Sequence, residues 1–123
     1  MQIDGACHCG LISFTAEVDP SRVTVCHCSD CQVLSGSPFR VLVAARTETF
    51  VLRRSPRSYV KVAQSGRRRA QVFCPECATP LYGTAPENPT SVNIRVGCNQ
   101  AAVRAVAFSP NLEAFGRGVA RRS

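Results

Sequence analysis

Seven of the eight cysteines in this chain stand in three short groups whose spacing is that of zinc ligands. The groups are Cys7-x-Cys9, Cys26-x-Cys28-x-x-Cys31 and Cys74-x-x-Cys77. The two pairs together can close one tetrahedral site, whereas the central trio leaves a fourth position open. Closed four-ligand zinc sites are structural, and three-ligand sites with an open position are typical of catalysis. The cysteine count therefore predicts one structural zinc site and one zinc site with an open coordination position.

Disulfides are the alternative use of eight cysteines. The chain begins MQIDGACHCG, which has none of the charged, apolar and cleavage regions of a secretory signal peptide. Thiols in the cytoplasm stay reduced, and the two cysteines of a C-x-C bridge poorly because disulfide geometry is demanding. We therefore favour metal binding and expect a cytoplasmic protein.

Length and charge set broad limits on function. The 123 residues predict a single zinc-binding β domain over 1–123, and no apolar stretch approaches the length of a membrane helix. The formal charge of +7 falls to about +4 once seven thiolates bind two Zn²⁺ ions. Fourteen of the fifteen basic residues are arginine, which suits anionic partners but also keeps a surface soluble. The dense run 67–69 reads as a solvated hairpin tip or as a carboxylate-binding patch.

Alternation of apolar and polar residues is the prevailing pattern. Ile12, Phe14, Ala16 and Val18 share one face of a predicted strand over 11–18. Breakers such as Asp19-Pro20 separate the other candidates. These further strands are predicted near 22–25, 39–45, 49–53, 58–63, 69–73, 80–84, 90–96 and 102–107. No helical stripe exceeds about two turns, so we expect a mainly β fold of many short antiparallel strands.

The residues around the cysteines allow several roles. His8 and His27 each stand between two cysteines, where an extended backbone turns them away from the sulfurs. Cys98 is most simply a buried free thiol, with an approach to one of the metals as the alternative. Asp30 is either a turn cap or a proton acceptor. Ala78 follows the last cysteine pair at a position where such turns usually have glycine.

At this point the residues resemble a known family. Gly5-Ala6-Cys7-His8-Cys9-Gly10, Cys26-His27-Cys28-Ser29-Asp30-Cys31 and Phe73-Cys74-Pro75-Glu76-Cys77, in this order, are similar to the glutathione-dependent formaldehyde-activating enzyme family, which includes centromere protein V. Two departures stand out. Ala78 replaces the usual glycine, and the tail over 101–123 looks shortened, without the tryptophan-containing segment of many members.

The resemblance implies a zinc-stabilised complex β fold like that of methionine sulfoxide reductase B and the small Rab-binding zinc proteins. It implies a structural zinc on Cys7, Cys9, Cys74 and Cys77 and a catalytic zinc on Cys26, Cys28 and Cys31. The implied activity is that of a carbon–sulfur lyase acting on a glutathione–aldehyde adduct, of the S-hydroxymethylglutathione synthase type, with glutathione and formaldehyde as partners. Arg40 and the run 67–69 are the nearest candidates for orienting the carboxylates of glutathione.

Two other classes of function compete with the lyase. One is a zinc-stabilised binding module without catalysis, which would follow if a fourth protein ligand such as Cys98 closed the trio. The other is nucleic-acid binding by a basic zinc domain. Against it, the arginines are dispersed, aromatic residues are few, and no recognition helix is predicted. The sequence leaves the oligomeric state open.

Overall fold

The structure is a computed structural model that describes residues 1–99. Eight strands, one short α-helix and two 3-10 turns make up this part of the chain. The strands are β1 (Gln2–Ala6), β2 (Ser13–Cys26), β3 (Arg40–Arg46), β4 (Val51–Arg53), β5 (Arg57–Val62), β6 (Arg68–Phe73), β7 (Pro80–Thr84) and β8 (Ser91–Arg95). The helical elements are α1 (Ser29–Ser35), η1 (Thr47–Thr49) and η2 (Val96–Cys98). A mainly β fold, as expected from the alternation, is confirmed.

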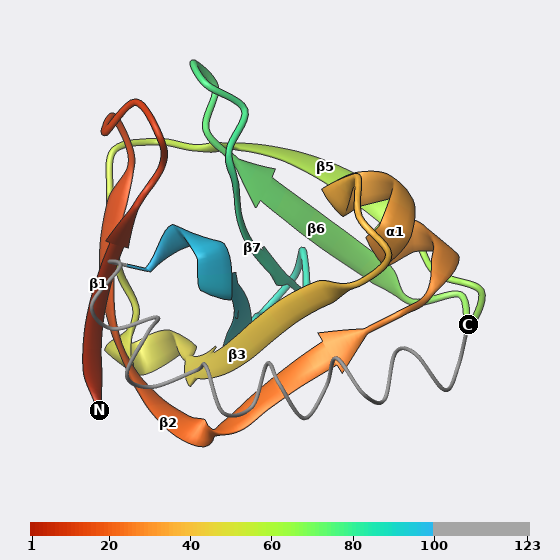
Figure 1. Cartoon of the computed structure of the whole chain (residues 1–123), viewed down its shortest axis with the longest axis horizontal. Coiled ribbons are helices and arrows are strands. Elements are labelled where there is room, and N and C mark those ends of the chain that lie inside the picture. The colour runs from red at the N-terminus through yellow and green to blue at the C-terminus, as the bar shows by residue number, and fades with distance from the viewer. Residues whose placement is uncertain (100–123) are drawn as a thin grey trace.

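All strand pairs are antiparallel, and the order across the sheet is β1-β2-β3-β8-β7-β6-β5, with β4 paired to β2. The sheet is strongly bent, so that β1 and β6 face one another across the interior (Figure 1). This curvature brings turns that are distant along the sheet into contact. Both cysteine groups at the β1–β2 and β6–β7 turns depend on it.

The strand β2 differs from its prediction. Two strands, 11–18 and 22–25, were expected on either side of Asp19-Pro20, but β2 is one strand of 14 residues. Its first half pairs with β1 and β4 and its second half pairs with β3, with a register shift between Val18 and Val23. Pro20 falls inside that shift, where no ladder hydrogen bond is required of it. The breaker therefore bends the strand without ending it.

The predicted face of this strand is confirmed by burial. Ile12, Phe14, Ala16 and Val18 are all buried, and they pack in one apolar core with residues from β1, β3, β7 and β8. Gly5 of β1 lies so close to Phe14 that a Cβ atom there would come within 2.5 Å of the ring. β1 itself was not predicted, because Ile3 is its one large apolar residue. The predicted strand 102–107 lies outside the described residues.

Candidate metal centres

The first cysteine cluster joins the β1–β2 turn to the β6–β7 turn. The Sγ atoms of Cys7, Cys9, Cys74 and Cys77 all lie within 4.8 Å of one another. The Sγ of Cys9 is 3.6 Å from that of Cys7 and 3.7 Å from that of Cys74. A tetrahedral zinc with bonds of about 2.3 Å requires sulfurs separated by about 3.8 Å. The predicted four-cysteine set is therefore brought together with a spacing that a zinc ion would fit.

The two turns that carry these cysteines share one backbone plan. The N–H of Cys7 donates to the carbonyl of Ile12, and the N–H of Cys74 donates to the carbonyl of Thr79. In each turn the residue after the second cysteine has positive φ, 84° at Gly10 and 64° at Ala78. Ala78 therefore adopts the left-handed conformation of the glycine that usually stands there, in which a side chain with a Cβ atom is disfavoured.

Hydrogen-bond donors surround the sulfurs of this cluster. The Sγ of Cys7 accepts from the N–H of Ile12 at 3.3 Å, and the Sγ of Cys74 accepts from the N–H of Glu76 at 3.3 Å. The Thr79 hydroxyl lies 3.1 Å from the Sγ of Cys77, and together with backbone N–H groups it lowers the pKa of Cys77 to about 5. Donors of this kind stabilise thiolates, which are the form that binds metal.

The second cluster is formed by the trio at the junction of β2 and α1. Cys26 is the last residue of β2, Cys28 is the N-cap of α1, and Cys31 is buried in the helix. Their Sγ atoms lie within 4.8 Å of one another, with 3.3 Å between those of Cys26 and Cys28. The cap places the Cys28 sulfur 3.4 Å from the N–H of Cys31, which donates to it. A helix that begins inside the motif therefore gathers the three sulfurs.

The electrostatic surroundings shift the pKa values of two thiols of the trio in opposite directions. Burial tends to raise the pKa of Cys28, but the N–H of Cys31, the neighbouring thiols and the ammonium of Lys61 together lower it below its ordinary value. Burial and the neighbouring thiols raise the pKa of Cys31 to about 12, against the opposing charge of Arg40. Cys28 therefore becomes a thiolate more readily than Cys31, which would lose its proton only when a cation binds.

Among residues 1–99 no fourth histidine, cysteine or carboxylate joins the trio. Cys98 lies in neither cluster and donates through its Sγ to the carbonyl of Pro80 at 2.8 Å. His8 and His27 are likewise outside both clusters. Asp30 accepts from the Nζ of Lys61 at 2.9 Å, an ion pair that ties α1 to β5. Either cluster could hold a metal ion, but within the described chain only the first has four ligands.

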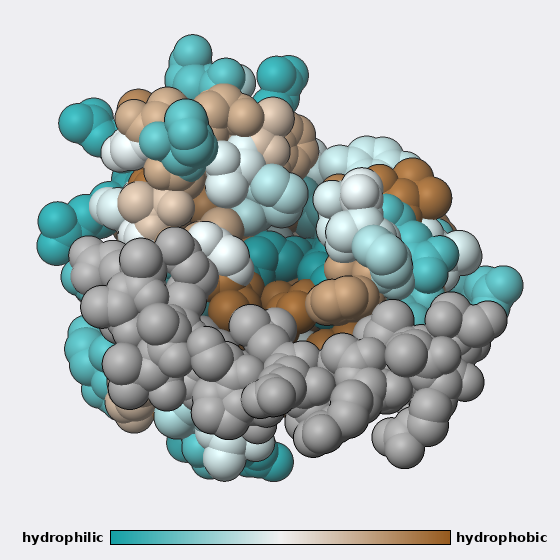
Figure 2. Space-filling view, viewed as in Figure 1, coloured by the Kyte–Doolittle hydropathy of each residue, from teal (hydrophilic) through white to brown (hydrophobic). Residues whose placement is uncertain are grey.

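Beside the trio lies a cavity of about 290 Å³ between α1 and the sheet. Its lining residues include Leu34 of α1, Arg40, Gln71 and Arg95. Arg40 is the direct strand partner of Cys26, and this pairing connects the lining of the cavity to the trio. The space-filling view shows that this side of the molecule is hollowed near its centre and that polar and apolar residues both line the hollow (Figure 2).

Sequence reasoning named Arg40 but missed Gln71, Arg95 and Lys61. The alternation gave no signal for Arg95. It follows Ile94 directly in the strand, so its side chain points to the other face of the sheet, which usually meets solvent. β8 lies between β3 and β7, however, and Arg95 is buried. The run 67–69 begins at the β5–β6 turn, as expected of a hairpin tip, and Arg68 pairs there with Glu87.

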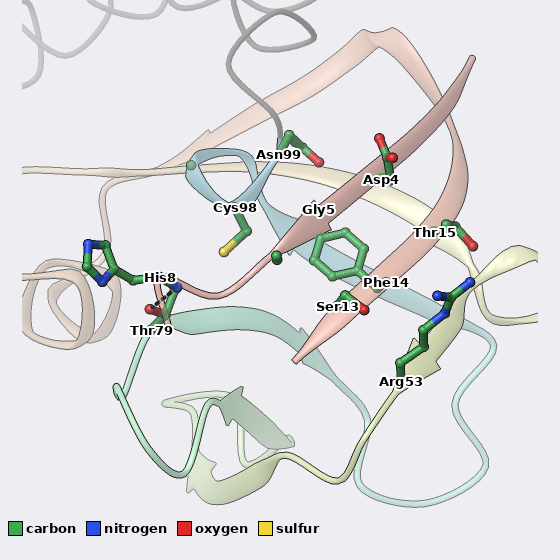
Figure 3. A pocket seen from close by; sticks show the side chains of 12 residues that line it. Asp4, Gly5, His8, Ser13, Phe14, Thr15, Arg53, Thr79, Cys98 and Asn99 are labelled. Atoms are coloured by element: carbon green, nitrogen blue, oxygen red, sulfur yellow. Dashed lines mark hydrogen bonds between the residues drawn. The ribbon is translucent and has the colours of Figure 1, made fainter. Parts of the chain in front are cut away.

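A larger cavity of about 720 Å³ lies elsewhere, against β1, β2 and η2. Figure 3 shows the ring of Phe14 at its centre, with Arg53 on one side and His8 and Thr79 on the other. None of the described residues that line it belongs to the trio or to the four-cysteine cluster. No cysteine lines the smaller cavity either, but that cavity is linked to the trio through Arg40, the strand partner of Cys26.

With this geometry established, comparison with known proteins identifies the family. The sequence model of the glutathione-dependent formaldehyde-activating enzyme matches residues 2–117. The chain belongs to this family. A curated relative, an uncharacterized lyase of Schizosaccharomyces pombe, is 26% identical over 94 residues, which are 75% of this chain and 66% of that protein. The match thus spans just under two thirds of the relative's length.

A solved structure supports the fold of this member of the glutathione-dependent formaldehyde-activating family. A crystal structure of a Rhodobacter sphaeroides protein superposes with a TM-score of 0.63 at 19% identity, covering 80% of this chain and 89% of that one. At this identity the likeness concerns the fold alone. No helix among residues 1–99 has the length and apolar character needed to cross a membrane.

Proposed function

We propose that this protein is a carbon–sulfur lyase that acts on the adduct of glutathione with formaldehyde, of the S-hydroxymethylglutathione synthase type. The observation that carries the proposal is the contrast between the clusters. Four cysteines converge in one, and three converge in the other without a fourth ligand among residues 1–99. The first would hold a structural zinc and the second a catalytic zinc.

The trio would act by holding the sulfur of the substrate. Because three thiolates donate much negative charge, a zinc ion on Cys26, Cys28 and Cys31 would bind a substrate thiolate in preference to polarising a carbonyl oxygen. The N–H of Cys31 and the ammonium of Lys61 favour the thiolate form of Cys28, and so keep the site ready for metal. The adjoining cavity beside Arg40 and Leu34 offers space for the rest of the substrate.

The proposed reaction is balanced without a further reagent. In the forward direction the glutathione sulfur forms a bond to the formaldehyde carbon, and the proton of the thiol ends on the former carbonyl oxygen. In the reverse direction the carbon–sulfur bond breaks, the hydroxyl proton returns to the sulfur, and formaldehyde and the thiol are released. Neither direction oxidises or reduces a group on the protein.

The competing proposal is a zinc-stabilised binding module without catalysis. It is favoured by the state of Asp30, the carboxylate closest to the trio in sequence, because Lys61 already pairs with it. A proton acceptor for the thiol would then have to be solvent or the substrate itself. Thiols add to formaldehyde without an enzyme, so only a measured rate enhancement separates the two proposals.

The test is exchange between formaldehyde, glutathione and their adduct at equilibrium, followed by NMR. Zinc-loaded protein should raise the exchange rate above the spontaneous rate measured in the same buffer. Cys28→Ser should abolish the increase, whereas Cys98→Ser, which changes a cysteine outside both clusters, should retain it. Equal rates with and without the wild-type protein would replace the lyase by the binding module.

A further inference from the structure

Two buried arginines beside the trio are not explained by the metal clusters. Arg40 of β3 and Arg95 of β8 are each 8% exposed, although arginine is almost never buried unless it is paired. Both donate to the Oε1 atom of Gln71, Arg40 from NH1 at 3.0 Å and Arg95 from NH2 at 2.8 Å. One neutral oxygen therefore faces two positive charges. We call Arg40, Gln71 and Arg95 the arginine cradle.

No carboxylate pairs with either of these arginines within residues 1–99. The ion pairs of this part of the chain involve neither arginine. The Nε atoms of Arg40 and Arg95 are both buried and lack a hydrogen-bond partner there. Burying a charged group is costly unless it is paired and hydrogen-bonded, and here two like charges are buried together. Such an arrangement is suited to an anion that arrives from outside.

The cradle is open to the cavity of about 290 Å³, which both arginines and Gln71 line. Leu34, Tyr59 and Phe73 supply apolar surface around the arginines. Gly83 leaves room for one guanidinium: a Cβ atom at Gly83 would lie 3.0 Å from NH2 of Arg95.

The cradle and the trio are joined through the chain at two points. Arg40 is the strand partner of Cys26, and Leu34 stands one turn after Cys31 in α1. An extended molecule with a sulfur at the trio would therefore reach the cradle with its other end.

We propose that the arginine cradle binds a carboxylate of the thiol substrate whose sulfur the trio holds. The proposal rests on the proposed function for the position of the sulfur, and it assigns the selectivity of the site to Arg40 and Arg95. Guanidinium groups present their N–H donors in a planar fork that matches the two oxygens of a carboxylate. The trio would select a thiol, and the cradle would select a thiol that is also an acid.

The first test examines the cradle without a thiol. Acetate is added to the zinc-loaded wild-type protein, and the Nε–H signals of its arginines are followed by NMR. The signals of Arg40 and Arg95 should shift in a saturable way, while that of exposed Arg46, on the same strand as Arg40, should not. Acetamide, which is uncharged, should have no effect. If acetate leaves both signals in place, the cradle does not bind carboxylates and the proposal is overturned.

The second test compares two thiols by calorimetry. Zinc-loaded wild type should prefer 3-mercaptopropionate over 2-mercaptoethanol by about 10- to 100-fold, as expected for charge-assisted hydrogen bonds. Arg95→Gln should remove this preference while 2-mercaptoethanol binds as before. Gly83→Ala keeps both arginines but crowds the Arg95 guanidinium, so it should reduce the preference in part. Arg46→Gln is the matched control and should behave as wild type.

The outcomes separate the two proposals. If both thiols bind equally well, the cradle proposal fails and the lyase proposal stands. If neither thiol binds but acetate shifts the arginine signals, the cradle stands as a carboxylate site and the proposed function fails. The last control concerns Glu113, the one Asp or Glu side chain in the sequence from 100 to 123. If Glu113→Gln moves the arginine signals without added ligand, an internal carboxylate occupies the cradle and the proposal is overturned.

Discussion

The contact between Thr79 and Cys77 shows how one hydroxyl controls a metal ligand. Together with backbone N–H groups, it lowers the pKa of Cys77 from the ordinary value of 9.0 to about 5. A thiol with a lowered pKa resists protonation, so it competes well for metal as the pH falls. The stability that the folded protein gains from this lowered pKa is therefore complete above pH 9.0, the ordinary pKa of the thiol. It is lost as the pH falls through about 5.

We predict that Thr79→Val raises the pKa of Cys77 and so makes the four-cysteine cluster release zinc at a higher pH. Thr79→Ser keeps the hydroxyl and should release zinc at the pH of the wild type. The measurement is the pH midpoint of zinc release to a colorimetric chelator. Identical midpoints for Thr79→Val and wild type would show that the hydroxyl does not stabilise the thiolate.

At the scale of the element, the two turns of the four-cysteine cluster offer a matched pair of substitutions. Ala78→Gly should raise the free energy of unfolding by about 1 kcal/mol, because glycine accepts positive φ without strain. Gly10→Ala, at the equivalent position of the other turn, should lower the free energy of unfolding by a similar amount. The positive φ is the only cost there, because no atom lies within 4 Å of an added Cβ. Denaturant unfolding of the zinc-loaded proteins gives both values, and a destabilised Ala78→Gly variant would contradict the argument.

Much of the element pattern could be predicted from the sequence, and the exceptions have physical causes. The strands from β3 to β8 follow alternating apolar residues or clear breakers, and their predicted ranges agree with the structure to within a few residues. β1 was missed because a single large apolar residue gives no recognisable period. The break expected at Asp19-Pro20 failed because the sheet changes pairing partners there and tolerates the proline.

The candidate site was only partly visible in the sequence. Both cysteine groupings follow from spacing alone, because thiolate ligands occur in recognisable pairs and trios. The arginine cradle does not, since Arg40, Gln71 and Arg95 lie on three strands whose adjacency is decided by the order of the sheet. The extent of a single domain over 1–123 and a location in the cytoplasm stay predictions.

At the scale of the whole molecule, the two clusters should differ in their importance for folding. The first cluster links residues 65 positions apart, and a cross-link of that span is worth about 4 kcal/mol of loop-closure entropy. Cys77→Ser should therefore destabilise the protein by about this amount or leave it unfolded. The trio spans one strand end and one turn of helix, so its loss should cost far less.

Cys28→Ser is the matched variant. It should bind about one zinc ion fewer than the wild type while keeping its far-ultraviolet circular dichroism spectrum and, within about 1 kcal/mol, its stability. Metal analysis of both variants under anaerobic conditions provides the comparison. A Cys77→Ser protein with wild-type melting and full metal content, or a Cys28→Ser protein that unfolds, would reverse the assignment of the two clusters.

The same difference in span sets an order of events during synthesis. A ribosome that has released the first half of the chain has already delivered Cys26, Cys28 and Cys31, which need only the start of α1 to come together. Cys7 and Cys9 must wait for Cys74 and Cys77, because half of their cluster has not yet been made. The trio can therefore bind zinc from the cell before the four-cysteine cluster can form, and the closing of that cluster requires a chain whose β6–β7 turn is complete.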